Sequence, residues 1–235
     1  MSDAFDFTEM SEDLVAVLES AEALQHHVPD ATLVGGSAAA RYANHRSSYD
    51  HDHVIKDLRE RFDLVLEALE SDPDWITNRV TPGKIILGQL GDIEAGVRQM
   101  IRTVPLEVRE VQLPSGNIVR VPTQQEALRI KAYLAVKRNQ VRDYLDIAAL
   151  SHRYERGNAA RALNEIDRYY TDPAMAGTPV ANQIVRQMAS VRPKDRSTIT
   201  QLDRYKNIRA PWNNWDHVKT VLLDIASRME RMDYS

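Results

Sequence analysis

Apolar side chains recur at helical spacing near the start of the chain. Between residues 8 and 27 they fall three or four positions apart and would line one face of a helix, at Leu14, Val15, Leu18, Ala21 and Leu24. Ser11, followed by Glu12 and Asp13, is a typical helix start, and Pro29 is a typical stop. We therefore predict an amphipathic helix over this segment.

The segment that follows, up to Pro122, alternates short predicted strands with helices. We expect a short strand or turn at 31–34, an alanine-rich helix at 37–44, a strand at 51–55 and a helix at 57–69. Further β-like runs lie at 85–87, 93–97, 106–113 and 118–121. The residues between the last two, 114–117, read Pro-Ser-Gly-Asn, which is typical of a hairpin turn.

Helical periodicity dominates after Pro122. Thr123, with Glu126 three residues later, has the sequence of a capping box. Helices are predicted at 124–137, 140–156, 158–169 and 214–231, with a loop over 171–179. The fold class is therefore predicted to be α+β, with a mixed β-sheet lobe over 1–122 and an all-helical lobe over 123–235.

The composition is that of an ordinary globular protein without disulfides. Of 235 residues, 43% are hydrophobic, 27% are charged and none is cysteine, which excludes a thiolate metal site. The N-terminal residues are acidic, so no signal peptide is expected, and no run approaches the ~18 apolar residues of a membrane span. We expect a cytoplasmic protein.

The net charge of −4 is distributed unevenly along the chain. Residues 1–150 carry 16 Lys and Arg against 24 Asp and Glu, whereas residues 151–212 carry 11 against 6. The later segment could offer a positive surface to a phosphate-rich partner, or its Arg-rich helices could simply be solvated. The sequence leaves both interpretations open.

Asp50 and Asp52 form the first candidate site. Residues two apart on a strand point to the same face, so these carboxylates would repel each other unless a cation lay between them. Mg²⁺ is commonly bound by one or two carboxylates together with nucleotide phosphates. A second Asp-x-Asp pair, Asp72 and Asp74, flanks a proline and is predicted to be a turn.

A possible phosphate loop, Gly35–Gly36–Ser37, precedes this aspartate pair and opens the alanine-rich helix. Glycines let backbone N–H groups approach a phosphate closely, and a helix N-terminus favours negative charge. A phosphate loop followed by a metal-binding pair is the combination that phosphoryl or nucleotidyl transfer requires.

These two features together resemble a known family. Gly35–Gly36–Ser37, followed by His45-Arg46-x-Ser48-x-Asp50-x-Asp52, is similar to the nucleotidyltransferase toxins of the AbiEii/AbiGii type, which share the polymerase-β-like nucleotidyltransferase fold. The resemblance implies that Asp50 and Asp52 hold Mg²⁺ (or Mn²⁺). It also implies that the glycines, Ser37 and Arg46 bind the nucleotide, with Ser48 included by its place in the motif.

Members of the superfamily usually have a third carboxylate on a neighbouring strand. Asp92 and Glu94 both lie in a suitable stretch. Glu94 alternates with the apolar positions of the run 93–97, so we expect it to be the third metal ligand. An exposed strand residue would give the same pattern.

A second group of residues, in the predicted helical lobe, also resembles this family. Lys131 is followed by Arg142–Asp143 and by Asp146 at the start of the next helix. Arg142 and Asp146 are four residues apart, which on its own would indicate a solvated helical ion pair. By resemblance, Lys131 would bind the triphosphate and Asp146 would complete the active site, while Asp143 would orient the helix.

Other interpretations of the histidines were weighed. His51 and His53 flank Asp52 where the family usually has apolar residues, and we expect them to face away from the metal. Arg46 and His51 match the Arg-x4–6-His spacing of a helical ribonuclease toxin class, but that fold is all-α. A His-Asp phosphohydrolase would need ligands from several helices.

The resemblance implies an enzyme that moves a nucleoside monophosphate from an NTP to an acceptor. The acceptor would be an RNA such as tRNA, or a protein. The protein would be the toxin of a toxin–antitoxin or phage-defence system, with a cognate antitoxin as partner. The alternative is a non-catalytic nucleotide- or partner-binding module on the same fold.

Overall fold

A five-stranded mixed β-sheet is the centre of the first of two units in the chain. The computed structural model describes residues 10–233, and the chain divides into units over 1–123 and 124–235. The sheet has the order β1-β2-β5-β4-β3, in which only β2 and β5 run parallel. Its strands are β1 (Thr32–Val34), β2 (Asp50–Ile55), β3 (Trp75–Thr81), β4 (Ile85–Leu90) and β5 (Ile93–Gln99).

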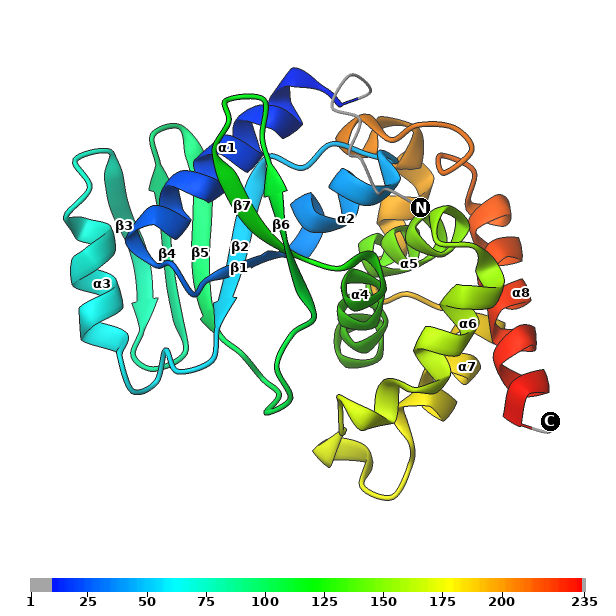
Figure 1. Ribbon diagram of the computed structural model, residues 1–235. Helices are drawn as coiled ribbons and strands as arrows, with labels where there is room; N and C mark the ends of the chain where they lie inside the picture. Colours follow the sequence, from blue (N-terminus) through cyan, green and yellow to red (C-terminus); the bar gives the residue numbers. More distant parts are fainter. Residues whose placement is uncertain (1–9, 234–235) are drawn as a thin grey trace. The chain divides into compact units, whose positions relative to one another are not determined.

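Three helices and a hairpin complete this unit (Figure 1). The helices are α1 (Glu12–His27), α2 (Gly35–Ala43) and α3 (Phe62–Glu70). The hairpin pairs β6 (Val108–Gln112) with β7 (Ile118–Pro122), as the turn sequence predicted. Ser11 begins α1 by accepting a hydrogen bond from the Leu14 amide at 3.3 Å, which confirms the predicted start.

One face of the sheet is packed against helices α1 and α3. Side chains alternate along β2, so every second residue of that strand is buried. Together with alternate residues of β3, β4 and β5 they pack on the apolar stripes of the two helices. The core members include Leu24, Val28, Ile55, Phe62, Val65, Leu69, Trp75, Ile86, Ala95 and Val97.

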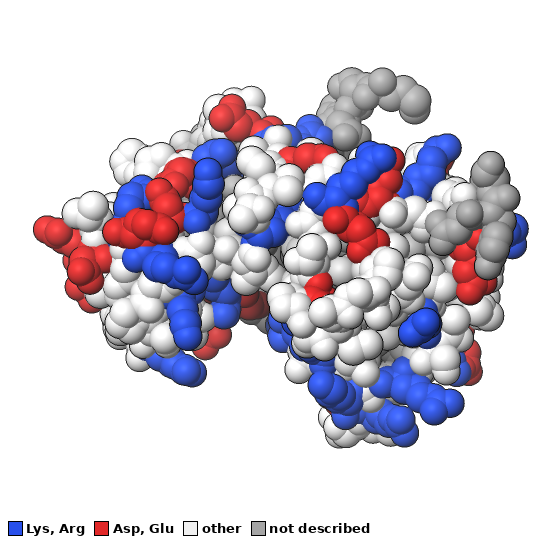
Figure 2. All heavy atoms as spheres, turned by 90° about the horizontal axis from the view of Figure 1, so that it is seen from below, with Lys and Arg blue, Asp and Glu red and all other residues white. Residues whose placement is uncertain are grey.

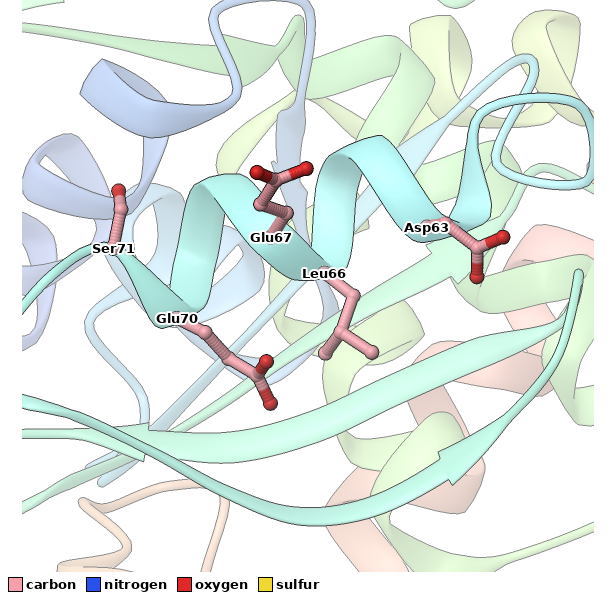
Figure 3. A pocket seen from close by; sticks show the side chains of 5 residues that line it. All are labelled: Asp63, Leu66, Glu67, Glu70 and Ser71. Atoms are coloured by element: carbon pink, nitrogen blue, oxygen red, sulfur yellow. The ribbon is translucent and has the colours of Figure 1, made fainter.

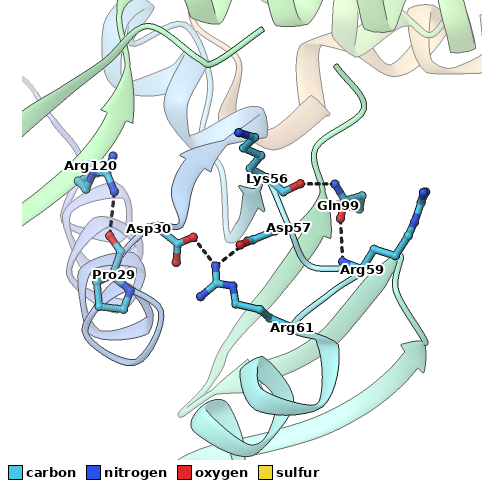
Figure 4. Close-up of polar contacts among 8 residues, drawn as sticks. All are labelled: Pro29, Asp30, Lys56, Asp57, Arg59, Arg61, Gln99 and Arg120. Atoms are coloured by element: carbon cyan, nitrogen blue, oxygen red, sulfur yellow. Dashed lines mark hydrogen bonds and ion pairs between the residues drawn. The ribbon is translucent and has the colours of Figure 1, made fainter. Parts of the chain in front are cut away.

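The connection between β2 and α3 is fixed by polar contacts near the protein surface (Figure 4). The Arg61 guanidinium, just before α3, donates to the carboxylates of Asp30 and Asp57, the latter at 2.6 Å. This guanidinium holds the pKa of the Asp57 carboxyl below its usual value. The Gln99 side chain joins the Lys56 carbonyl to the Arg59 amide at 2.6 and 2.8 Å. Residues 57–61 therefore form a turn, and the helix predicted from 57 begins at Phe62.

The second unit is helical. Its α-helices are α4 (Gln124–Arg138), α5 (Val141–Arg153), α6 (Arg156–Asn164), α7 (Val180–Ala189) and α8 (Trp215–Asp233), joined in part by the 3₁₀ segments η2 (Ile166–Arg168), η3 (Pro173–Met175) and η4 (Arg196–Asn207). Most of α5 is buried, and α4, α6, α7 and α8 pack around it and one another. Within residues 10–233, no helix combines the length and apolar character needed to cross a membrane.

The predicted α+β class, with a mixed sheet followed by helices, is confirmed. Strand β3, helix α7 and the 3₁₀ segments η3 and η4 were not predicted. Strand β3 is an edge strand on which only Trp75 is fully buried, so its sequence lacks a clear alternation. Helix α7 directly follows Pro179, at the end of the predicted loop, and no element was predicted over its residues. Residues 8 and 9 of the first predicted helix lie outside the described residues.

A buried histidine pair lies on the helix-covered face of β2. His51 is 1% exposed and His53 is fully buried. The His51 ring shares a 3.0 Å hydrogen bond with Ser20 of α1 and lies 3.5 Å from the His53 ring. Burial lowers the pKa of His51 to about 4, and burial with the neighbouring His51 lowers the pKa of His53 well below its usual value.

Because the pKa values of both histidines are lowered, we expect the protein to lose stability in mild acid. Between pH 6.5 and 4 the unfolded chain takes up protons that the folded chain excludes, so stability decreases as the pH falls. His51 alone should contribute a loss of about 2 kcal/mol between pH 7 and pH 5. Urea unfolding at the two pH values measures this. His51→Gln should reduce the difference, and His26→Gln, an exposed position on α1, should leave it unchanged.

Candidate functional site

Asp50 and Asp52 lie on the face of β2 opposite the histidine pair. Both aspartates are half-buried, whereas His51 and His53 between and after them are buried. The register places Asp50 beside Glu94 and Asp52 beside Gly96 of the parallel strand β5. The expectation that the two aspartates share one face is confirmed, and the histidines face away from them.

The predicted phosphate loop lies directly against Asp52. Gly35 begins α2 with φ +80°, a conformation that glycine adopts without strain. A Cβ atom at Gly35 would lie 3.5 Å from the Asp52 Cβ and 3.6 Å from its Oδ2 atom. The N-terminal turn of α2 therefore brings backbone N–H groups and a carboxylate to the same place.

Gly36 leaves room for two side chains of the motif. A Cβ atom there would lie 2.8 Å from the Ser48 Oγ and 2.9 Å from an Arg46 amino group, so both side chains would have to shift. Arg46 and Ser48 are both buried and pack onto this glycine. Two residues of the motif that resembles the toxin family, Arg46 and Ser48, therefore pack against the glycine loop.

The two serines of the motif hold Asp50 in place. The fully buried Ser37 hydroxyl donates to the Asp50 backbone carbonyl, and Ser48 donates to the Asp50 Oδ1 atom at 3.3 Å. This gives Ser48 the role that the sequence did not indicate. The phosphate contacts expected for Ser37 and Arg46 stay predictions, because these side chains make protein contacts here.

Arg98 is a site residue that the sequence analysis missed. Its Nε atom donates to Asp52 Oδ1 at 3.0 Å, and the two side chains are 44% and 31% exposed. Arg98 lies two residues beyond Gly96 on β5, on the same face as Glu94. The alternation Glu94, Gly96, Arg98 was present in the sequence, but only the β2–β5 register shows that it faces the aspartates.

Neither candidate for the third carboxylate, Glu94 or Asp92, forms a three-carboxylate group with Asp50 and Asp52. Glu94 is the Cα partner of Asp50, but its side chain is exposed, and Asp92 lies in the turn before β5. Across residues 10–233, no three His, Asp or Glu side chains are grouped so as to hold a metal ion. The metal role of Glu94 stays a prediction.

Asp50 and Asp52 alone still fit one Mg²⁺ or Mn²⁺ ion. Mg²⁺ keeps several waters and is often bound through one or two carboxylates, with substrate phosphates as further ligands. Both aspartates are half-exposed, and Ser48 orients one of them. The donor set therefore suits an ion that the nucleotide helps to bind.

Lys131 and Asp146, in the second unit, form a buried ion pair with each other. The Lys131 Nζ lies 2.6 Å from Asp146 Oδ2, and the side chains are 3% and 0% exposed. Arg142, whose spacing on its own indicated a solvated ion pair with Asp146, is exposed, and the side chain close to Asp146 is Lys131. Asp143 accepts two 2.7 Å hydrogen bonds from Arg138 and so ties the start of α5 to the end of α4.

A shallow hollow beside α3 offers no alternative site. Its lining comes from one helix and its end, at Asp63, Leu66, Glu67, Glu70 and Ser71 (Figure 3). Helix α3 covers the sheet face opposite Asp50 and Asp52. Its three carboxylates have no basic side chain beside them in the lining, and the Ser71 hydroxyl donates to the Ala68 carbonyl, so the hollow does not suit a phosphate substrate.

Comparison with solved structures identifies the fold. MenT4, a nucleotidyltransferase toxin of Mycobacterium tuberculosis, has a TM-score of 0.55 at 15% identity, covering 93% of this chain and 84% of that one. JHP933 of Helicobacter pylori has a TM-score of 0.53 at 16% identity, covering 96% and 97%. This chain has a nucleotidyltransferase fold. No family model matches its sequence.

Sequence comparison finds relatives of a different kind. A stretch of 148 residues, 61% of this chain, is 38% identical to the heme uptake protein MmpL11 of Mycobacterium tuberculosis. A stretch of 128 residues is 34% identical to the mycolic acid-containing lipids exporter MmpL11 of Mycolicibacterium smegmatis. These matches span only 14% and 13% of the two relatives, so they relate a segment and not the whole proteins.

Because Lys131 and Asp146 form a buried ion pair, we expect removal of the lysine charge to lower the stability of the protein strongly. Lys131→Met would remove a cation that lies 2.6 Å from the fully buried Asp146 carboxylate, and should destabilise the protein by about 3–5 kcal/mol. The double variant Lys131→Met/Asp146→Leu should recover most of this loss, as measured by urea unfolding. Lys137→Met is the matched control, because Lys137 is 37% exposed beside Asp172 and should matter much less. Equal losses in the two lysine variants would contradict the prediction.

Proposed function

We propose that this chain is a Mg²⁺- or Mn²⁺-dependent nucleotidyltransferase that moves a nucleoside monophosphate from an NTP to an acceptor hydroxyl. The observation that carries the proposal is the contact between the Gly35 turn and Asp52. It places a helix N-terminus, which favours phosphate, against a pair of carboxylates suited to a divalent ion.

In the proposed reaction, different residues of this site would bind the phosphates and the divalent ion. Backbone N–H groups at the start of α2 would bind the phosphates, and Asp50 and Asp52 would hold the divalent ion. The ion supplies positive charge where negative charge develops on the leaving pyrophosphate. Ser48 and Ser37 fix Asp50 through its side chain and its carbonyl, so this carboxylate is oriented before the substrate arrives.

The biological role that we propose is that of a toxin in a toxin–antitoxin or phage-defence system, with a cognate antitoxin as partner. The motif around Gly35 and Asp50 supports this, and so does the fold shared with MenT4. The family assignment to the AbiEii type rests on the motif alone. The roles of Lys131 and Asp146 rest on the same resemblance.

An RNA such as tRNA is the acceptor that the charge distribution favours. The loop 192–196 is tied to the link between α4 and α5, because the Lys194 amide donates to Asn139 at 2.8 Å and Val141 donates to Asp195 at 2.8 Å. This brings together exposed cationic side chains that are distant in sequence, at Arg142, Arg192, Lys194 and Arg196. Lys and Arg gather in several groups on the face shown in Figure 2.

A non-catalytic binding module is the second candidate function. It is favoured by the lack of a three-carboxylate group among residues 10–233 and by the Arg98 guanidinium that already neutralises Asp52. The related segment within MmpL11 transport proteins is a further reason to keep it. A nucleotide could bind to such a module without being turned over.

Transfer of label from an NTP tests the proposed reaction. The protein is incubated with Mg²⁺, each α-³²P-labelled NTP in turn and total tRNA, and the products are separated on a denaturing gel. Label should appear on RNA with at least one NTP and disappear in Asp52→Asn, because a neutral amide binds the ion poorly. Asp63→Asn, on α3, should retain full activity. Label on the protein itself would indicate a protein acceptor, and nucleotide binding without label would favour the binding module.

The cationic side chains near residues 139–142 predict salt-dependent RNA binding. The double variant Arg192→Gln/Arg196→Gln should weaken tRNA binding and reduce the slope of log affinity against log salt by about 2, since each phosphate contact contributes about 1. Filter binding at several salt concentrations measures this. Arg168→Gln is the control, because Arg168 is exposed, pairs with the nearby Glu165 and lies outside the loop 192–196. If the slope of log affinity against log salt is unchanged in the double variant, Arg192 and Arg196 do not contact the RNA.

A further inference from the structure

We propose that Arg98 is a phosphate-binding residue of this site, oriented by Asp52, and that it makes the aspartate pair a centre for a single divalent ion. This inference rests on the proposed function and names the group that replaces the missing third carboxylate. Its ligand is a nucleoside triphosphate, recognised through a phosphate group.

The first argument is how the guanidinium is held. Only its Nε atom is bonded, to Asp52 Oδ1 at 3.0 Å, and within the described residues the two terminal nitrogens make no further hydrogen bond. The side chain is 44% exposed, so those nitrogens are accessible. An arginine anchored through Nε presents a planar pair of N–H donors, a geometry that matches two phosphate oxygens.

The second argument is the space that Gly96 provides. A Cβ atom on Gly96 would lie 2.9 Å from Asp52 Oδ1 and 2.9 Å from a Leu87 methyl group. With any larger residue the Asp52 carboxylate and the Leu87 side chain would have to shift from these positions. The glycine therefore permits the Asp52–Arg98 contact and leaves Asp52 Oδ2 towards the Gly35 turn, where the phosphates would bind.

The third argument is charge. Asp50 and Asp52 carry two negative charges and Arg98 one positive charge, so the group has a net charge of −1. A site with three free carboxylates would carry −3 and could hold two divalent ions. With Oδ1 of Asp52 already occupied by a guanidinium, one ion and one fixed cation share the neutralisation of the triphosphate.

The test uses two probes that do not require turnover. Mn²⁺ binding to the full chain without nucleotide is followed by electron paramagnetic resonance, and inorganic triphosphate binding without metal is followed by calorimetry. Arg98→Gln should raise the Mn²⁺ affinity about 3–10-fold, because a nearby positive charge is removed. The same variant should lower the triphosphate affinity about 10-fold, because the anion loses a charged donor pair.

Two further variants separate this role from simpler ones. Arg98→Lys keeps the charge and loses the planar donor pair, so it should bind Mn²⁺ like the wild type and triphosphate more weakly. Arg79→Gln removes an exposed arginine from the edge strand β3, and should change neither affinity. Thermal unfolding of each variant confirms that it is folded.

The opposite direction of the two changes is the decisive result. If Arg98 only positioned Asp52, the Mn²⁺ affinity would fall in Arg98→Gln, and that outcome overturns the proposal. An unchanged triphosphate affinity overturns it as well, while leaving nucleotidyl transfer intact. A wild-type protein that binds neither Mn²⁺ nor triphosphate would overturn the proposed function together with this inference.

Discussion

The candidate site depends on the close packing of backbone around one carboxylate. Asp52 lies between Gly35 at the start of α2 and Gly96 on the neighbouring strand, and side chains at those glycines would press against it. The parallel pairing of β2 with β5 sets one of these contacts, and the immediate passage from β1 into α2 sets the other. A carboxylate held in this way needs no additional element to reach the turn at Gly35.

The two faces of strand β2 have different roles, one in the hydrophobic core and one in the candidate site. The face with His51, His53 and Ile55 is buried under α1 and α3, and the histidines are kept neutral by burial. The other face keeps Asp50 and Asp52 half-exposed. Because alternate residues share one strand, the packing of the histidines also fixes the position of the carboxylates.

Arg98 changes the electrostatics expected for such a site. In the proposed site, the guanidinium beside Asp52 would supply part of the positive charge that a second metal ion would otherwise bring. This is compatible with an enzyme that uses one ion and with a module that binds nucleotide without turnover. The fold shared with MenT4 and JHP933 fits both, and the MmpL11 relatives show that a related segment occurs within much longer proteins.

Local patterns in the sequence were enough to predict most of the elements and the central motif. Periodicity gave the α+β class and most helices, and the motif from Gly35 to Asp52 placed glycines and carboxylates in adjacent elements, because strand alternation and glycine's conformational freedom are local properties. Which distant residues contact this motif became visible only once the strands and helices were packed together. The β2–β5 register brought Arg98 to Asp52, and the packing of α4 on α5 joined Lys131 to Asp146. Such pairings depend on which strands and helices become neighbours, and no local pattern encodes that choice.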